Sequence, residues 1–87
     1  MTTRRAVALR YEKQREEAPR IVAKGAGEVA DAIIRTASSH EVPVMENKEL
    51  VDALISLEID SVIPAELYQA VAEVLAYVYQ YGNRRSR

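Results

Sequence analysis

The spacing of the apolar residues changes near Gly25, and this change divides the 87-residue chain into two parts. Before it, Val7 and Leu9 alternate with smaller or polar residues, which is the period of a β-strand with one buried face. A second short apolar run, residues 21–23, ends at Gly25. After Gly27 the apolar residues recur every three or four positions, as they do in amphipathic helices. The sequence therefore predicts two strands followed by a mainly helical region.

One further strand is expected within the helical region. The first predicted helix covers residues 27–37, and residues 42–45 are then expected to form a third strand. Two strands joined by a helix of this length should be parallel, with a right-handed crossover. The predicted fold class is α/β, with a small mixed β-sheet that contains a parallel strand-helix-strand unit, and about three packed helices.

Two more helices are marked by their terminal residues. Asn47 is a favourable N-cap for a helix that continues through Leu57. Pro64 suits the first position of the last helix, and Gly82 is expected to end it. We expect residues 1–5 to be a flexible basic N-terminus, residues 6–81 the folded domain and residues 82–87 a basic tail.

The last predicted helix is apolar over most of its circumference. One stripe has the spacing of core residues and comprises Leu67, Val71, Val74 and Val78. A second stripe lies beside it and comprises Tyr68, Ala72, Leu75 and Tyr79. A helix with such a wide apolar arc is either wedged deeply in the domain or presents a surface to a partner.

Composition excludes several functional classes. The chain has no cysteine and one histidine, His40, so neither a disulfide nor a zinc site is expected. His40 lies at a predicted helix end, where a capping role is more plausible than a catalytic one. No apolar run approaches the roughly 20 residues that span a bilayer, so we expect a cytoplasmic chain without direct membrane insertion.

The charges are segregated along the chain although the net charge is only −1. Residues 1–24 carry seven Lys or Arg and three acids, whereas residues 25–81 carry two and ten. This distribution predicts a dipolar surface suited to a charged protein partner, and it is too balanced for a nucleic-acid binder. Ordinary solvated surface charge is the alternative interpretation.

The motif G-x-G-x-x-A occurs as Gly25, Gly27 and Ala30, and Glu46 follows about 20 residues later, as in dinucleotide-binding folds. It suggests an alternative function as a small nucleotide-binding regulatory domain. The simpler interpretation is that the two glycines make a tight turn between a strand and a helix. The chain is short for the second half of a nucleotide fold, so we expect no cofactor.

Three segments resemble the cytoplasmic domain of FlhB-type export-gate proteins of flagella and type III secretion (the FlhB/YscU/SpaS family). They are Ala6 to Tyr11 (AVALRY), Ala18 to Gly25 (APRIVAKG) and Ile63 to Tyr79 (IPAELYQAVAEVLAYVY). The resemblance implies a non-catalytic accessory of the flagellar or type III protein export gate. Such an accessory would bind export substrates, chaperones or other gate components at the cytoplasmic periphery of the membrane-embedded apparatus.

The resemblance also implies that one family reaction is absent. Family members cleave themselves in an Asn-Pro-Thr-His loop, where the Asn side-chain amide attacks its own carbonyl group. The corresponding positions begin with Met1 and Thr2, and only Thr3 matches the loop, so no autocleavage is expected. Upstream residues of full-length members supply a further strand, so the first strand here is expected to have an open edge that can pair with another chain.

A candidate binding site follows from the same resemblance. In FlhB-like domains a small hydrophobic surface is associated with recognition of export substrates, and the matching positions are Ala18, Pro19, Ala72 and Leu75. In the alternative interpretation, Ala18 and Pro19 merely start a strand and Ala72 permits close helix packing.

Overall fold

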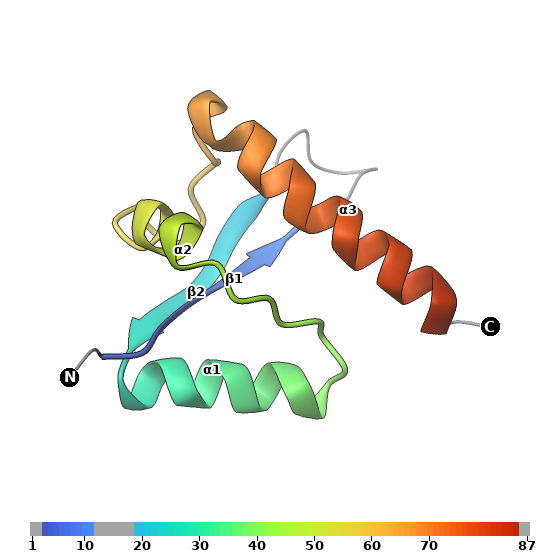
Figure 1. Ribbon diagram of the computed structural model, residues 1–87. Coiled ribbons are helices and arrows are strands. Elements are labelled where there is room, and N and C mark those ends of the chain that lie inside the picture. Colours follow the sequence, from blue (N-terminus) through green and yellow to red (C-terminus); the bar gives the residue numbers. More distant parts are fainter. Residues whose placement is uncertain (1–2, 12–18, 86–87) are drawn as a thin grey trace.

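The computed structural model describes the backbone of residues 3–11 and 19–85, and the side chains in these ranges as far as Tyr77. Figure 1 shows two paired strands between one helix on one side and two helices on the other. The elements, in chain order, are β1 (Arg5–Arg10), β2 (Arg20–Ala26), α1 (Glu28–Ser39), α2 (Lys48–Leu54), the 3₁₀ helix η1 (Ala65–Leu67) and α3 (Tyr68–Arg85).

The two strands run antiparallel and present residues of different size on their two faces. Ala6 pairs with Gly25 on one face, and Leu9 pairs with Ile21 on the other. The register shifts after Ala8, so that β2 has one extra residue at this point, which is a β-bulge. Small side chains therefore face α1, whereas large ones face α2 and α3.

The small residues let α1 approach the sheet closely. A Cβ atom added to Gly25 would lie 2.1 Å from Cγ1 of Val29, closer than any real contact. Ala6 on β1 and Ala30 on α1 are both buried. Gly27 connects β2 to α1 with φ of 63°, a conformation that glycine adopts without strain. Both glycines of the G-x-G motif therefore have a structural role: Gly25 allows the close approach of α1, and Gly27 adopts the positive φ of the turn.

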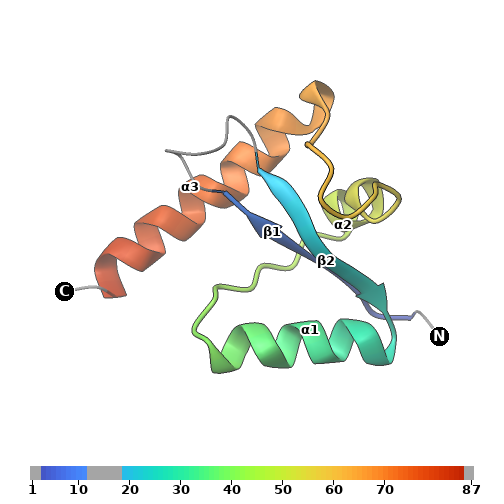
Figure 2. The same cartoon turned by 180° about the vertical axis from the view of Figure 1, so that it is seen from behind.

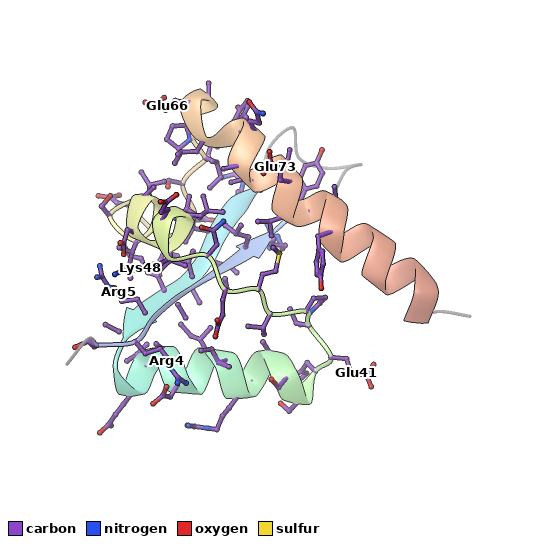
Figure 3. All side chains as sticks on the ribbon, viewed as in Figure 1. Arg4, Arg5, Glu41, Lys48, Glu66 and Glu73 are labelled. Carbon is purple, nitrogen blue, oxygen red and sulfur yellow. The ribbon has the colours of Figure 1, made fainter. Side chains whose placement is uncertain are left out.

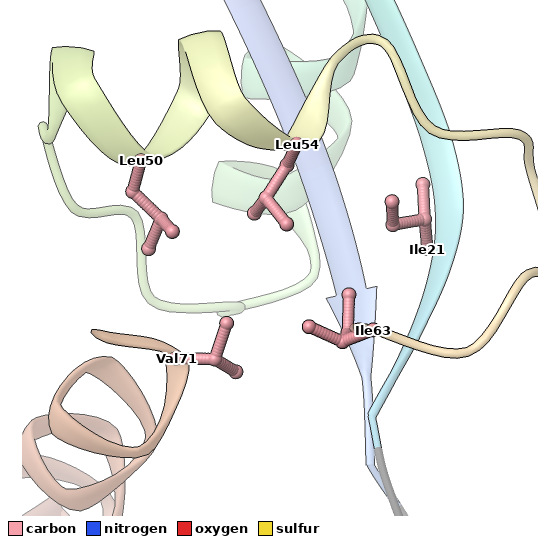
Figure 4. Packing of buried hydrophobic residues seen from close by; sticks show 5 residues of the cluster. All are labelled: Ile21, Leu50, Leu54, Ile63 and Val71. Atoms are coloured by element: carbon pink, nitrogen blue, oxygen red, sulfur yellow. The ribbon is translucent and has the colours of Figure 1, made fainter. Parts of the chain in front are cut away.

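The core lies on the other face of the sheet, where Figure 4 shows side chains of four segments meeting. Its buried members are Ile21 from β2, Leu50 and Leu54 from α2, Ile63 from the segment before η1, and Val71 from α3. Burying each such side chain contributes roughly 1.5 to 3 kcal/mol. This one cluster therefore holds α2 and α3 to the sheet.

The predicted N-cap of α2 is confirmed. The Asn47 side-chain oxygen accepts a hydrogen bond from the Leu50 backbone N–H at 3.0 Å. The same turn buries Leu50, so the cap fixes the start of α2 where its apolar face enters the core.

The segment after α2 is fastened to the outer edge of β2. The Asp60 backbone N–H donates to the Ile21 carbonyl at 2.6 Å, and Val62 forms an isolated antiparallel bridge with Arg20. The Arg20 guanidinium also donates to the Asp60 carbonyl at 2.8 Å. These bonds position the next residue, Ile63, in the core, where its side chain is 1% exposed.

The α/β class and the packed helices are as predicted, but the sheet differs. In the described part of the chain it has two antiparallel strands, in place of the predicted mixed sheet with a parallel strand-helix-strand unit. The expected third strand, residues 42–45, has no strand structure. Pro43 has no N–H to contribute to a ladder, and Val42 instead donates its N–H to the Ala37 carbonyl at 2.8 Å. Strand propensity alone therefore did not produce pairing.

Three predicted helix boundaries are also corrected. The α2 helix ends at Leu54 instead of Leu57. Pro64 caps η1, and α3 begins after it. The predicted end at Gly82 is wrong, because α3 continues to Arg85 and includes four residues assigned to the tail. Glycine inside a helix costs only about 1 kcal/mol relative to alanine, so it need not end one.

Candidate functional site

The first half of α3 separates into a buried stripe and an exposed one. Val71 is 1% exposed, and Leu67 and Val74 pack against the core, as predicted for the first stripe. Tyr68 is 48% exposed and Ala72, four residues later, is also exposed. The two stripes of the sequence therefore have different roles on the described part of the helix. The side chains of Val78 and Tyr79 lie outside the described residues.

Leu75 forms the border between the two stripes. It is half-buried and packs against the core cluster, although its helical position is next to that of Ala72. Its substitution would thus affect both stability and any surface at this place. Of the predicted site residues on α3, Ala72 alone is free of a core role.

Pro19 lies immediately before β2 and is half-buried. Figures 1 and 2 both show the start of β2 beside the first half of α3, and Ile21 shares the core cluster with Val71. The elements that carry Pro19 and Ala72 are therefore neighbours. The fourth predicted site residue, Ala18, lies outside the described residues.

One exposed side chain that the sequence analysis did not assign to the site lies on the same helix face. Tyr68 is one helical turn from Ala72, and the second stripe of the sequence was the signal for it. Val62 is also exposed, but it is bridged to Arg20 and alternates with the buried Ile63, so it faces away from the core cluster that α3 covers. We define the α3 surface as Pro19, Tyr68, Ala72 and Leu75.

The charges surround this surface unevenly. Figure 3 places Arg4 and Arg5 near the start of β1, and places Glu66 of η1 and Glu73 of α3 away from them. Because Asp31 and Asp52 lie beside these arginines, the dipolar surface stays a prediction.

Two ion pairs partly neutralise the positive charge of the arginines at the start of β1. Arg4 lies 3.3 Å from Asp31 of α1, and Arg5 lies 3.1 Å from Asp52 of α2. All four side chains are at least 40% exposed, so each pair contributes about 1 kcal/mol at most. Their main effect is to tie the start of β1 to both helices.

The turn at Gly27 does not have the arrangement of a nucleotide site. Its N–H donates to the Arg4 carbonyl at 2.7 Å, so this donor is not directed at a ligand. An open depression of about 480 Å³ adjoins the turn, and its lining includes Arg35 and the paired Arg4 and Asp31 side chains. Glu46 lies in a segment without strand structure, whereas the nucleotide fold requires a second parallel strand there. The nucleotide-binding alternative thus finds no support.

His40 has a capping position, as expected. Its backbone N–H donates to the Thr36 carbonyl at 3.1 Å, and its Nδ1 atom lies 2.9 Å from the same oxygen. The side chain is exposed. Across residues 3–11 and 19–85, no group of three or more His, Cys, Asp or Glu residues could hold a metal ion. No helix in these ranges is long and apolar enough to cross a membrane.

The described residues form a small α/β domain with an exposed apolar stripe on α3. Sequence comparison identifies its family. The model of the FlhB HrpN YscU SpaS Family matches residues 2–78. The chain therefore belongs to this family, whose members include flagellar and type III export-gate proteins.

Relatives differ greatly in length. The Bacillus subtilis protein YlqH is 44% identical over 77 residues, which cover 88% of this chain and 83% of YlqH. The flagellar biosynthetic protein FlhB of Yersinia enterocolitica is 48% identical over 79 residues, which cover 90% of this chain but 21% of FlhB. The chain thus spans about a fifth of the length of the FlhB proteins that it matches.

Solved structures agree with the sequence relationship. The cytoplasmic domain of FlhB from Shewanella putrefaciens matches with a TM-score of 0.88 and 35% identity, over 94% of this chain and 64% of that one. The PscU C-terminal domain matches with a TM-score of 0.80 and 32% identity, over 84% of this chain and 94% of that one. The chain is therefore similar to the cytoplasmic C-terminal domains of export-gate proteins.

Proposed function

We propose that this chain is a non-catalytic, cytoplasmic binding module of the flagellar or type III protein export apparatus. Its partners are export substrates, their chaperones or other components of the export gate. Family membership and similarity to cytoplasmic FlhB and PscU domains support this assignment. The structural observation that carries it is the exposed stripe of Tyr68 and Ala72 on a helix whose opposite side is docked in the core.

The α3 surface is suited to an apolar side chain of a partner. Ala72 is small, so it leaves a low point on the helix between larger neighbours, whereas Tyr68 offers an aromatic ring and a polar hydroxyl group. Pro19 adds a rigid apolar ring that brings little conformational entropy to lose on binding. Ala18, from the same family-derived set, completes the proposed site.

The module acts without cleaving itself. The family reaction requires an Asn side-chain amide as the nucleophile, and Met1 and Thr2 occupy the corresponding positions. A thioether cannot form the cyclic imide. We expect mass spectrometry of the purified chain, after prolonged incubation at neutral pH, to find no break between residues 1 and 5. A spontaneous break there contradicts this part of the proposal.

Pairing of the β1 edge with another chain also belongs to the proposal. In the described residues β1 pairs with β2 alone, so its other edge has no strand neighbour there. Unpaired edges accept strands from other chains.

The substitution Ala72→Glu tests the α3 surface directly. It places a charge at an exposed position, so the fold should remain while partner affinity falls by about tenfold or more. Ala53→Glu is the matched control, since Ala53 is an exposed alanine on α2. Both variants are compared by thermal melting and by titration with purified export substrates and chaperones. Normal stability together with normal binding in Ala72→Glu would exclude the α3 surface.

A further inference from the structure

Lys24 is a charged residue on the core side of the sheet. It lies in β2 and pairs with Val7 of β1, which packs against the core cluster. Residues that pair across two strands share a face of the sheet, so the Lys24 side chain is on the side that α2 and α3 cover. It is half-buried there. Lysine is rarely buried without a partner for its charge, so the contacts of this side chain need an explanation.

The partners of Lys24 are main-chain carbonyl groups. Its Nζ atom donates to the Ile55 carbonyl at 3.0 Å and to the Leu57 carbonyl, which lie 31 and 33 positions later in the chain. No carboxylate in the described part of the chain is paired with it. The charge of Lys24 is therefore balanced by carbonyl dipoles at the end of α2.

The end of α2 lacks a cation of its own. Its last turn contains no basic residue. The last carbonyl groups of a helix have no partner within it and carry a partial negative charge. Ile55 is the C-cap of α2, and the Leu57 N–H donates to the Leu54 carbonyl at 3.0 Å, so both acceptors belong to this helix end. The Lys24 ammonium group thus supplies from β2 the positive charge that α2 lacks.

The residues that follow α2 lie along β2, as Figures 1 and 2 show. We call residues 55–62 the β2 strap. Lys24 holds its first part, and the bond from the Asp60 N–H to the Ile21 carbonyl holds its second part. Residues 58–60 are exposed. A short segment with exposed residues and few bonds is of the kind that opens locally while the rest of a domain stays folded.

We propose that Lys24 is a latch for the β2 strap. Its positive charge holds the end of α2 against the sheet, and loss of this charge lets the strap open as a unit while the strand pair and α1 stay folded. The strap leads directly into Ile63 of the core cluster, so the latch also sets how firmly the core beneath α3 is closed. This inference stands apart from the proposed binding of partners.

NMR of the lysine ammonium groups tests the latch in the parent chain. The Nζ protons of Lys24 should exchange with water about tenfold or more slowly than those of Lys48, because Lys48 is exposed whereas Lys24 donates to two carbonyl groups. Equal exchange of the two ammonium groups overturns the proposal, since the Lys24 charge would then be solvated.

Native-state hydrogen exchange in low urea measures the opening of the strap. The amides of Leu57 and Asp60 lie within it, and those of Gly27 and Asp31 are hydrogen-bonded outside it. Local opening exposes little surface, so the strap amides should exchange with little dependence on urea and be about tenfold or more less protected than the other two. If all four amides follow the urea dependence of global unfolding, the strap does not open on its own and the proposal is overturned.

Three substitutions show whether the Lys24 charge controls this opening. Lys24→Met keeps most of the aliphatic stem without the charge and should accelerate exchange of the Leu57 and Asp60 amides by about tenfold or more. Lys24→Arg keeps the charge and should stay within about threefold of the parent chain. Lys48→Met is the matched control, because it removes an exposed lysine from α2, and should change nothing. Parent-like exchange in Lys24→Met overturns the proposal. If that variant does not fold, the two measurements on the parent chain still decide.

Discussion

The two connections on either side of α2 have similar composition but different structures. Residues 59–63 contain Ile59, Val62 and Ile63 and are fastened to β2, whereas residues 42–46 contain Val42, Val44 and Met45 and are exposed. Both connections also contain or adjoin a residue with positive φ, Asp60 at 73° and Glu41 at 61°. The two connections differ in main-chain pairing, because the second is bonded to β2 whereas residues 43–46 form no backbone hydrogen bond in the described structure.

The outer edge of β2 accepts the second connection at its start. There the Ile21 carbonyl binds the Asp60 N–H, and Ile63 follows into the core. The first connection is bonded to no strand edge in the described part of the chain, although β1 has an edge without a strand neighbour there. This contrast gives the second connection a structural role that the first does not share.

The largest effect is expected for Ile63→Ala. Ile63 is 1% exposed and contacts the cluster that holds α2 and α3, so its truncation should lower the free energy of unfolding by about 2 to 5 kcal/mol. Urea denaturation of the variant and the parent chain measures the change. A loss below about 0.5 kcal/mol would mean that the second connection is not anchored as described.

A smaller effect is expected where the first connection meets α2. Asn47→Ala removes the side-chain acceptor of the Leu50 N–H and should cost about 1 kcal/mol. Asn47→Asp is the matched control, because aspartate caps equally well and should retain stability. If the alanine and aspartate variants unfold at the same urea concentration, the cap does not contribute.

The smallest effect is expected for Val44→Ala. Val44 is half exposed, so its truncation should change the free energy of unfolding by less than about 0.5 kcal/mol. The comparison with Ile63→Ala under identical urea conditions is direct, because both variants remove a β-branched side chain from a connection to α2. A cost similar to that of Ile63→Ala would show that Val44 is packed in solution.

The sequence predicted those features that depend on local chemistry. The Asn47 cap, the strand alternation of Val7 and Leu9, and the stripe that contains Val71 all follow from residue type and spacing. Features that depend on distant neighbours were predicted less well. Residues 42–45 have strand propensity, but propensity does not supply a pairing edge. Gly82 permits a helix to end without forcing it to do so.

The candidate site was predicted only in part for the same reason. The second stripe of α3 was visible from spacing, but burial of Leu75 and exposure of Tyr68 depend on where the core lies. The bridge between Val62 and Arg20 brings a segment 42 positions later in the chain beside β2. Spacing within one element cannot predict such a contact.

Amide hydrogen exchange of the free chain, measured by NMR, tests the contrast between the two connections most directly. The Asp60 N–H is bonded to Ile21, whereas the N–H groups of Val44 and Met45 have no backbone partner in the described structure. We expect the Asp60 amide to exchange at least about a hundredfold more slowly than its unfolded rate, and the Val44 and Met45 amides to exchange within about tenfold of theirs. Strong protection of Val44 and Met45 would show that a third strand is paired in the free chain, and would contradict the account.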